Sequence, residues 1–315
     1  MSNALTSCVT IPGKSKINSC YQDTQNDTLK WVQKFDIAPK FKPLSWYSKA
    51  RFGFQAAREY PDATYAQVSL AGDLLSWLFT VDDSCDRGSS DAVTALEMRR
   101  QLEIFISILD DKYIEDDHSL SIALKDILRR FSAISSPFLY RKYCMHMTDY
   151  LNECFFEIDM QIDGLMPSID RYYKERPYTG FYIMFPLVAI FEKLNLPDEV
   201  YDHSSIQEIE LILNLLGCLS NDLHSIVREA KLEKPGFNLI FIAQKELDLA
   251  RDEAVQYVIN EHRAHLRRFK QLRKELPYWG KAVNMQVDRY IQGLYTIVRG
   301  YDDWAVIDTG RYENI

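Results

Sequence analysis

Two apolar segments each lead directly into a group of oxygen-bearing side chains, and this pairing limits the folds that the chain can adopt. Leu74–Val81 runs into Asp82–Asp86, and Leu211–Leu219 runs into Asn221–Glu229. Carboxylates that directly follow so apolar a turn lie near the core, where an ionised group is unfavourable unless a cation or a partner compensates it. Both segments therefore predict helices that carry polar groups to a buried site.

The spacing within each group fits one face of a helix. Asp82 and Asp86 are one turn apart, and Asn221, Ser225 and Glu229 recur at every fourth position, so each set points to one side. Carboxylate, amide and hydroxyl oxygens are the ligands that Mg²⁺ prefers, and Mg²⁺ is usually held by a few of them together with water and substrate phosphates. Two such walls facing each other would form a pocket for a diphosphate held by several metal ions.

The composition is that of an ordinary globular protein with enough apolar material for a large core: 315 residues, 47% hydrophobic and 26% charged. With only 12 glycines and little strand-like alternation, helices are favoured. The net charge of −8 argues against nucleic acid as a partner. The longest apolar run, Phe181–Phe191, is too short to span a bilayer. Six scattered cysteines without zinc spacing are typical of reduced thiols in a cytoplasmic protein.

Residues 1–28 show no apolar segment or targeting signal and are expected to be disordered. From residue 29 to residue 315 no linker divides the chain, so a single α-helical domain is expected there. A broken or kinked helix is expected where Thr179 and Gly180 precede Phe181–Phe191, which contains Pro186. Periodicity and capping signals predict the other main helices at Thr28–Phe35, Ser45–Glu59, Thr64–Arg87, Asp91–Leu109, Ser119–Ala133, Ser136–Ile162, Ser204–Leu232, Asn238–Gln244, Leu247–Leu276 and Gly280–Arg299.

Taken together, these residues make the chain similar to the bacterial-type class I terpene synthases, or terpene cyclases. The resemblance covers nearly all of the chain after the first 30 or so residues and implies an all-α, single-domain helical bundle around a central active-site cavity. Two positions depart from the family pattern: Arg228 stands where many relatives have Lys, and Thr179 where some carry an acid. The matching segments, in the family's order, are Ala56–Ala63, Asp82–Asp86, Arg176 with Thr179 and Gly180, Asn221 with Ser225 and Glu229, and Arg311 with Tyr312.

The resemblance also implies roles for these residues. Asp83 would pair with an arginine such as Arg311, whereas Gly180 and Thr179 would form the effector and linker of an induced-fit turn. The implied ligands of Mg²⁺, three ions in all, are Asp82, Asp86, Asn221, Ser225 and Glu229. The implied donors to the diphosphate are Arg176, Arg228, Arg311 and Tyr312, since the planar guanidinium fork binds phosphate oxygens in pairs. The implied catalytic residues are Asp82, Arg176, Gly180, Arg311 and Tyr312.

Aromatic side chains are expected to line the rest of the pocket, because their faces stabilise a carbocation and a dry wall excludes water. The candidates, together with Thr179, are Phe54, Phe79, Phe181 and Trp304. Phe79 is the strongest, since it lies one turn before Asp82 on the same helix. The alternative for each ring is ordinary core packing in a chain with 5 Trp, 19 Tyr and 16 Phe.

The implied reaction is the ionisation of an isoprenyl diphosphate, with farnesyl diphosphate favoured, and cyclisation of the carbocation to a terpene hydrocarbon or alcohol. A diterpene cyclase acting on geranylgeranyl diphosphate is the main alternative. A chain-elongating prenyltransferase is more remote, because it would carry a second aspartate-rich motif in place of the Asn/Ser/Glu pattern. A di-iron bundle lacks its ligands, and a non-enzymatic scaffold would not need the buried oxygen donors. No membrane or nucleic acid is expected as a partner; a homodimer is left open, and a cytoplasmic location is expected.

Overall fold

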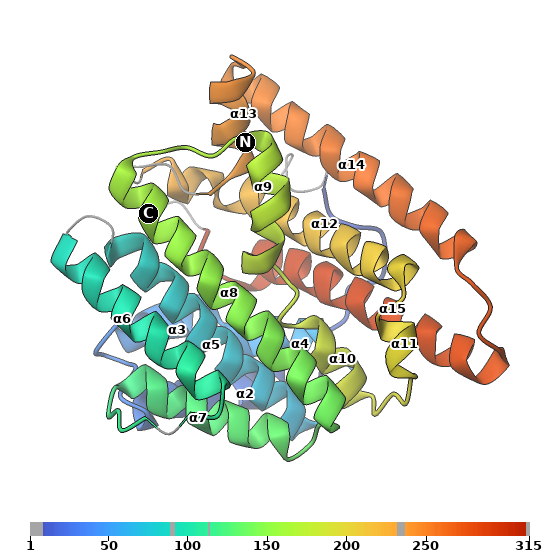
Figure 1. Cartoon of the computed structure of the whole chain (residues 1–315), viewed down its shortest axis with the longest axis horizontal. Coiled ribbons are helices and arrows are strands. Elements are labelled where there is room, and N and C mark those ends of the chain that lie inside the picture. Colours follow the sequence, from blue (N-terminus) through green and yellow to red (C-terminus); the bar gives the residue numbers. More distant parts are fainter. Residues whose placement is uncertain (1–8, 89–91, 113, 232–236, 313–315) are drawn as a thin grey trace. The chain divides into compact units, whose positions relative to one another are not determined.

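The computed structural model describes residues 9–88, 92–112, 114–231 and 237–312. Every regular element within these ranges is a helix (Figure 1). The all-α class predicted from the low glycine content and the helical periodicity is therefore confirmed.

The chain forms two compact units, although its composition shows no break near Leu165. The amino-terminal unit comprises Ile17–Leu165 together with Asp308–Arg311, and the carboxy-terminal unit comprises Met166–Ile307 together with Met1–Lys16 and Tyr312–Ile315. Helices of the amino-terminal unit are α2 (Tyr21–Lys34), α3 (Leu44–Ala50), α4 (Phe52–Glu59), α5 (Tyr65–Gly88), α6 (Ala92–Leu109), α7 (Ser119–Ser132) and α8 (Pro137–Asp163). Helices of the carboxy-terminal unit are α9 (Ile169–Glu175), η1 (Arg176–Thr179), α10 (Phe185–Phe191), α11 (Asp198–Tyr201), α12 (Ser204–Glu229), α13 (Leu239–Glu246), α14 (Arg251–Glu275), α15 (Lys281–Asp303) and the π-helical turn η2 (Trp304–Asp308), except for its last residue, Asp308.

In the amino-terminal unit, α5 packs against α2, α4, α6, α7 and α8. Two glycines allow the close crossing of α2, α4 and α5. A Cβ atom at Gly53 would lie 2.5 Å from the backbone of Gln25, and one at Gly72 would lie 2.8 Å from the Thr28 hydroxyl. Leu74 and Trp77 are completely buried, so this packing holds the polar end of α5 in place.

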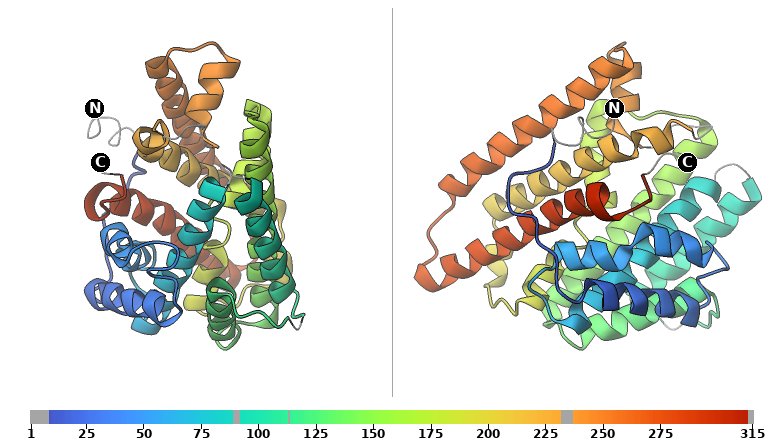
Figure 2. Two further views of the ribbon diagram at one scale, coloured as in Figure 1. Left: turned by 90° about the vertical axis from the view of Figure 1, so that its left-hand side faces the viewer. Right: turned by 180° about the vertical axis from the view of Figure 1, so that it is seen from behind.

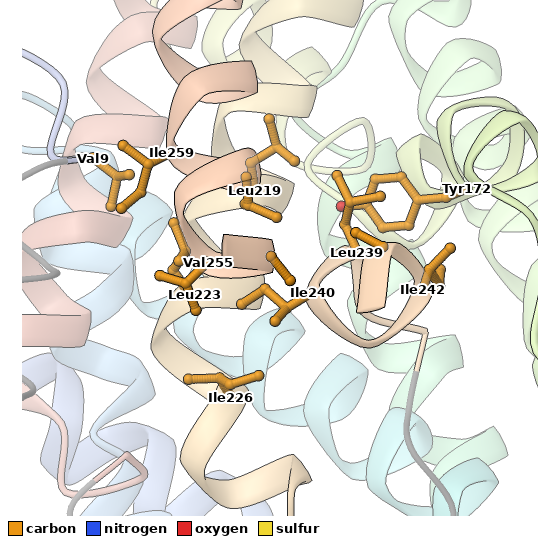
Figure 3. Close-up of a cluster of buried hydrophobic side chains, with 13 residues drawn as sticks. Val9, Tyr172, Leu219, Leu223, Ile226, Leu239, Ile240, Ile242, Val255 and Ile259 are labelled. Atoms are coloured by element: carbon orange, nitrogen blue, oxygen red, sulfur yellow. The ribbon is translucent and has the colours of Figure 1, made fainter. Parts of the chain in front are cut away.

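In the carboxy-terminal unit, α12 lies beside α14 and α15, and it also packs on α13 and η1 (Figures 1 and 2). The apolar contact between α12, α13 and α14 is shown in Figure 3, where Leu223 and Ile226 of α12 face Ile240 and Val255. Burial of this cluster fixes the course of the helix that carries Asn221–Glu229.

The expected disorder does not hold for the described part of residues 1–28. Val9 and Ile11 are buried, and α2 already begins at Tyr21. The sequence pattern did not indicate this helix because much of the buried surface of α2 is polar. Gln25, for example, accepts a hydrogen bond from the Gly53 N–H at 2.9 Å and donates one to the Tyr47 carbonyl at 3.3 Å, so its burial is compensated.

Two helix boundaries differ from those predicted, and a predicted break is confirmed. The segment Ser45–Glu59 is two helices, because Arg51 adopts a left-handed conformation with φ 58°. The long helix expected from Leu247 begins only at Arg251, after Asp248 at φ 52°. The break expected near Gly180 is confirmed, since η1 ends at Thr179 and α10 starts at Phe185.

Candidate active site

The stripe of oxygen donors on α12 lies on an unbroken helix. Because α12 continues through Glu229, the donors at Asn221, Ser225 and Glu229 share one side of it. Ser225 is buried, whereas Asn221 and Glu229 are half-buried. The helix therefore presents an amide, a hydroxyl and a carboxylate in succession.

Arg176 reaches this stripe from η1. Its guanidinium group donates to the Asn221 amide oxygen at 3.0 Å and to the Asp222 carboxylate at 3.2 Å. It also donates to the Thr179 hydroxyl at 3.0 Å. The structure thus places Arg176 and Thr179, which the sequence analysis took from one segment, beside Asn221 of the α12 stripe.

Tyr312 approaches Asn221 from the C-terminal segment. The Asn221 amide nitrogen donates to the Tyr301 hydroxyl at 2.6 Å and to the Tyr312 hydroxyl at 3.3 Å, and the two hydroxyl groups are 2.9 Å apart. The Tyr312 ring stacks on His224 and meets the edge of Trp304. Trp304 is completely buried, so it supports Tyr312 from within the core.

Asp222, to which the sequence analysis gave no role, accepts three hydrogen bonds. One of its oxygens accepts hydrogen bonds from the Tyr172 hydroxyl and the Leu239 N–H, each at 2.8 Å, and the other accepts from Arg176. Burial raises the pKa of Asp222 to about 6, and the nearby Arg176 charge opposes this shift. Asp222 therefore ties α9, η1 and α13 to α12.

Asn238, the N-cap of α13, lies against the other end of the stripe. Its amide nitrogen is 3.0 Å from a Glu229 carboxylate oxygen and 3.5 Å from the Ser225 hydroxyl. The sequence indicated Asn238 only as the start of a helix.

Gly180 lies where only a glycine fits against α12. A Cβ atom at this position would be 2.1 Å from the Asn214 amide oxygen and 2.5 Å from the Cys218 sulfur. Asn214 accepts from the Phe181 N–H and donates to the Pro177 carbonyl, both at 2.8 Å. The Phe181 ring meets Tyr301 edge-on. Asn214, also missed from the sequence, thus holds the segment around Gly180 against α12.

In the amino-terminal unit, the second aspartate of Asp82–Asp86 is enclosed by two cations. Asp83 accepts from Arg311 at 2.6 Å and from Lys42 at 2.5 Å, and all three side chains are buried. The expected pairing of Asp83 with Arg311 is confirmed, whereas Lys42 was not expected. With both oxygens engaged, Asp83 is an ion-pair partner in this structure.

Asp82 is half-buried and lies near α8. Burial raises the pKa values of Tyr150 and Cys154 well above their usual range, and the Asp82 charge adds to both shifts. Asp86 belongs to α5, but its side chain lies outside the described residues.

The two remaining aromatic candidates differ in surroundings. Phe79 stacks on Phe52 with centroids 4.7 Å apart, and the Arg311 guanidinium lies 4.8 Å from its ring. Phe54 packs against Tyr21 and Arg51. For Phe79 the geometry shows a protein cation on the ring, which the sequence did not indicate.

Arg228, one of the implied donors to the diphosphate, is half-buried and directly precedes Glu229 on α12.

A family model matches residues 73–268, a range that includes both polar groups. It is described as terpene synthase family 2, C-terminal metal binding. The chain belongs to this family. As a class I terpene synthase it is an enzyme, its substrate is an isoprenyl diphosphate, and its reaction, a cyclisation, uses a divalent metal.

Named relatives cover nearly the whole terpene synthase chain. A germacrene A synthase of Nostoc punctiforme is 25% identical over 96% of this chain and 94% of its own length. A (+)-T-muurolol synthase of Roseiflexus castenholzii, named as cyclising (2E,6E)-farnesyl diphosphate, is 29% identical over 90% of this chain and 87% of its own. In fold, the chain is similar to a linalool/nerolidol synthase of Streptomyces clavuligerus, with a TM-score of 0.80 at 22% identity over 94% of this chain and 98% of that one.

The donor set of α12 fits a hard divalent ion, because all three candidate ligands are oxygens and the Asn221 amide oxygen keeps a second lone pair beside Arg176. Among the described residues of the synthase, no group of three or more His, Cys, Asp or Glu that could hold a metal occurs. Within the same described residues, no helix is long and apolar enough to cross a membrane.

Proposed function

We propose that this terpene synthase is a Mg²⁺-dependent sesquiterpene cyclase that acts on farnesyl diphosphate. The observation that supports it most is the convergence of Arg176 and Tyr312 on Asn221, at the start of the donor stripe. Farnesyl diphosphate is favoured because the relative from Roseiflexus castenholzii is named as cyclising it.

We assign metal binding to the two polar groups of the sequence. The proposed ligands are Asp82, Asp86, Asn221, Ser225 and Glu229. Three Mg²⁺ ions, when bound, would supply the positive charge that stabilises the departing diphosphate. Asp83 is assigned a different task, holding Arg311 and Lys42, since both of its oxygens already accept from these cations.

The protein's own donors would hold the diphosphate. Arg176, Arg228, Arg311 and Tyr312 are the proposed donors, and hydrogen bonds from positioned N–H and O–H groups stabilise negative charge as the allylic C–O bond breaks. We propose that Gly180 is the effector of an induced-fit turn that responds to the bound diphosphate. Arg176 and Thr179 precede it in the same segment and are hydrogen-bonded to each other next to Asn221.

The carbocation would then be handled by apolar surfaces. The proposed pocket residues are Phe54, Phe79, Thr179, Phe181 and Trp304. Trp304 would act through Tyr312, because it is completely buried against that ring. A ring at van der Waals distance stabilises a cation through its π-face and excludes water from it.

We propose that residues 29–315 work as one catalytic domain, which α2 extends back to Tyr21. We further propose a cytoplasmic enzyme, with a homodimer as one option for its assembly.

The experiment is incubation of the purified protein with the C10, C15 and C20 isoprenyl diphosphates and Mg²⁺, followed by gas chromatography and mass spectrometry. A cyclic C15 hydrocarbon or alcohol is expected from farnesyl diphosphate. A cyclic C20 product as the main turnover would favour the diterpene cyclase, and a longer linear diphosphate would favour the prenyltransferase.

A further inference from the structure

Asn238 occupies a position from which one side-chain amide contacts two of the proposed metal ligands. It is 1% exposed and lies nine residues after Glu229, the last residue of α12. We propose that Asn238 is a positioning residue of the metal site, which holds Glu229 and Ser225 in place without itself contacting metal or substrate. This inference rests on the proposed function.

The orientation of the amide follows from its backbone partner. The Asn238 oxygen accepts from the Ile240 N–H at 2.9 Å, as the N-cap of α13. Because an N–H must face an acceptor, the oxygen is committed to α13 and the –NH₂ group must face α12.

The –NH₂ group has two protons and three acceptors within reach. The Asp222 carbonyl at 2.9 Å and a Glu229 carboxylate oxygen at 3.0 Å are the shorter contacts, and the Ser225 hydroxyl at 3.5 Å is at the limit of a hydrogen bond. One proton therefore goes to the helix backbone and the other to Glu229, with Ser225 in weaker contact. We assign the second carboxylate oxygen of Glu229 to a metal ion.

The surroundings make Asn238 rigid enough to act in this way. The next residue, Leu239, is completely buried and donates its N–H to Asp222 at 2.8 Å. Leu239 and Ile240 belong to the apolar cluster that joins α13 to α12 and α14 (Figure 3). A hydrogen-bonded partner held this firmly orients a carboxylate ligand, and loss of such a partner commonly lowers metal affinity by about 10- to 100-fold.

Asn238→Ser tests the role, because serine keeps a capping oxygen for α13 but loses the amide donors. The matched control is Asn284→Ser, since Asn284 also bridges backbone groups, accepting from Trp279 and donating to Pro277. Binding of Mn²⁺ in the presence of inorganic diphosphate is measured by electron paramagnetic resonance, and the thermal midpoint of each variant is recorded alongside.

Asn238→Ser is expected to weaken Mn²⁺ binding by about tenfold, with Asn284→Ser close to wild type. In a Glu229→Gln background the same substitution should have less effect, because its partner is already altered. With farnesyl diphosphate as substrate, the Mg²⁺ concentration for half-maximal rate should rise more than kcat falls. Where the serine variant does not fold, Asn238→Thr carries the same test.

Mn²⁺ binding by the Asn238 variants within about twofold of wild type would overturn the positioning role while leaving the proposed function intact. An equal loss in the Asn284 control, or an equal loss in both Glu229 backgrounds, would also overturn it. If the wild-type protein bound neither Mn²⁺ nor diphosphate, the proposed function would fall, and the role of Asn238 with it.

Discussion

Asp222 and Ser225 stand three positions apart on α12, yet their contacts predict opposite consequences of substitution. Asp222→Asn places an –NH₂ group among the donors Tyr172, Leu239 and Arg176, so it should lower the free energy of unfolding by about 1–3 kcal/mol. Ser225→Ala loses only a contact of 3.5 Å and should change stability by less than about 1 kcal/mol. Urea unfolding of both variants checks this, and a larger loss of stability in Ser225→Ala than in Asp222→Asn would contradict it.

The segment between η1 and α10 is attached to α12 by Asn214, and Gly180 makes the close approach possible. Gly180→Ala would push the new methyl group into the Asn214 amide and break its bonds to Phe181 and Pro177, so stability should fall by about 1–3 kcal/mol and turnover should slow. Asn214→Ala breaks the same two bonds. The double variant should therefore lose clearly less than the two single losses added together; strict additivity in thermal unfolding would contradict the shared attachment.

These elements also show why only part of the site could be predicted from the sequence. The α12 stripe could be predicted, because the spacing of Asn221, Ser225 and Glu229 is a local property of one helix. Asn238 was recognisable only as an N-cap, since its contact with Glu229 depends on how α13 folds back against α12. Lys42 next to Asp83 depends in the same way on tertiary packing, and no local pattern marks it. Polar burial in α2 was missed because Gln25 reads as a surface residue until its partners are known.

Buried carboxyl groups in both units should each make a contribution to stability that decreases as the pH rises. Burial raises the pKa of Glu59 to about 8 and of Asp73, despite Arg130, to about 7 in the amino-terminal unit, and that of Asp222 to about 6 in the carboxy-terminal unit. A raised folded-state pKa means that the folded chain holds a proton that the unfolded chain has released, so stability falls as the pH rises from the unfolded pKa to the folded one.

Glu59→Gln isolates the largest of these shifts and keeps an acceptor for the Gln55 amide. Relative to wild type, the free energy of unfolding of the variant should increase between about pH 5.5 and about pH 7.5, by at most about 1.4 kcal/mol for each pH unit. Thermal midpoints across this range measure the difference. A constant gap between the two proteins would show that Glu59 does not titrate in this window.

The measurement closest to the central claim is the Mg²⁺ dependence of farnesyl diphosphate turnover in wild type, Ser225→Ala and Glu229→Ala. If the α12 stripe binds metal, the Mg²⁺ concentration for half-maximal rate rises in Ser225→Ala and rises further in Glu229→Ala, because the first loses a neutral ligand and the second a charged one. Excess chelator abolishes product in all three proteins. Full turnover in chelator, or an unchanged Mg²⁺ requirement in both variants, would contradict the assignment of this helix.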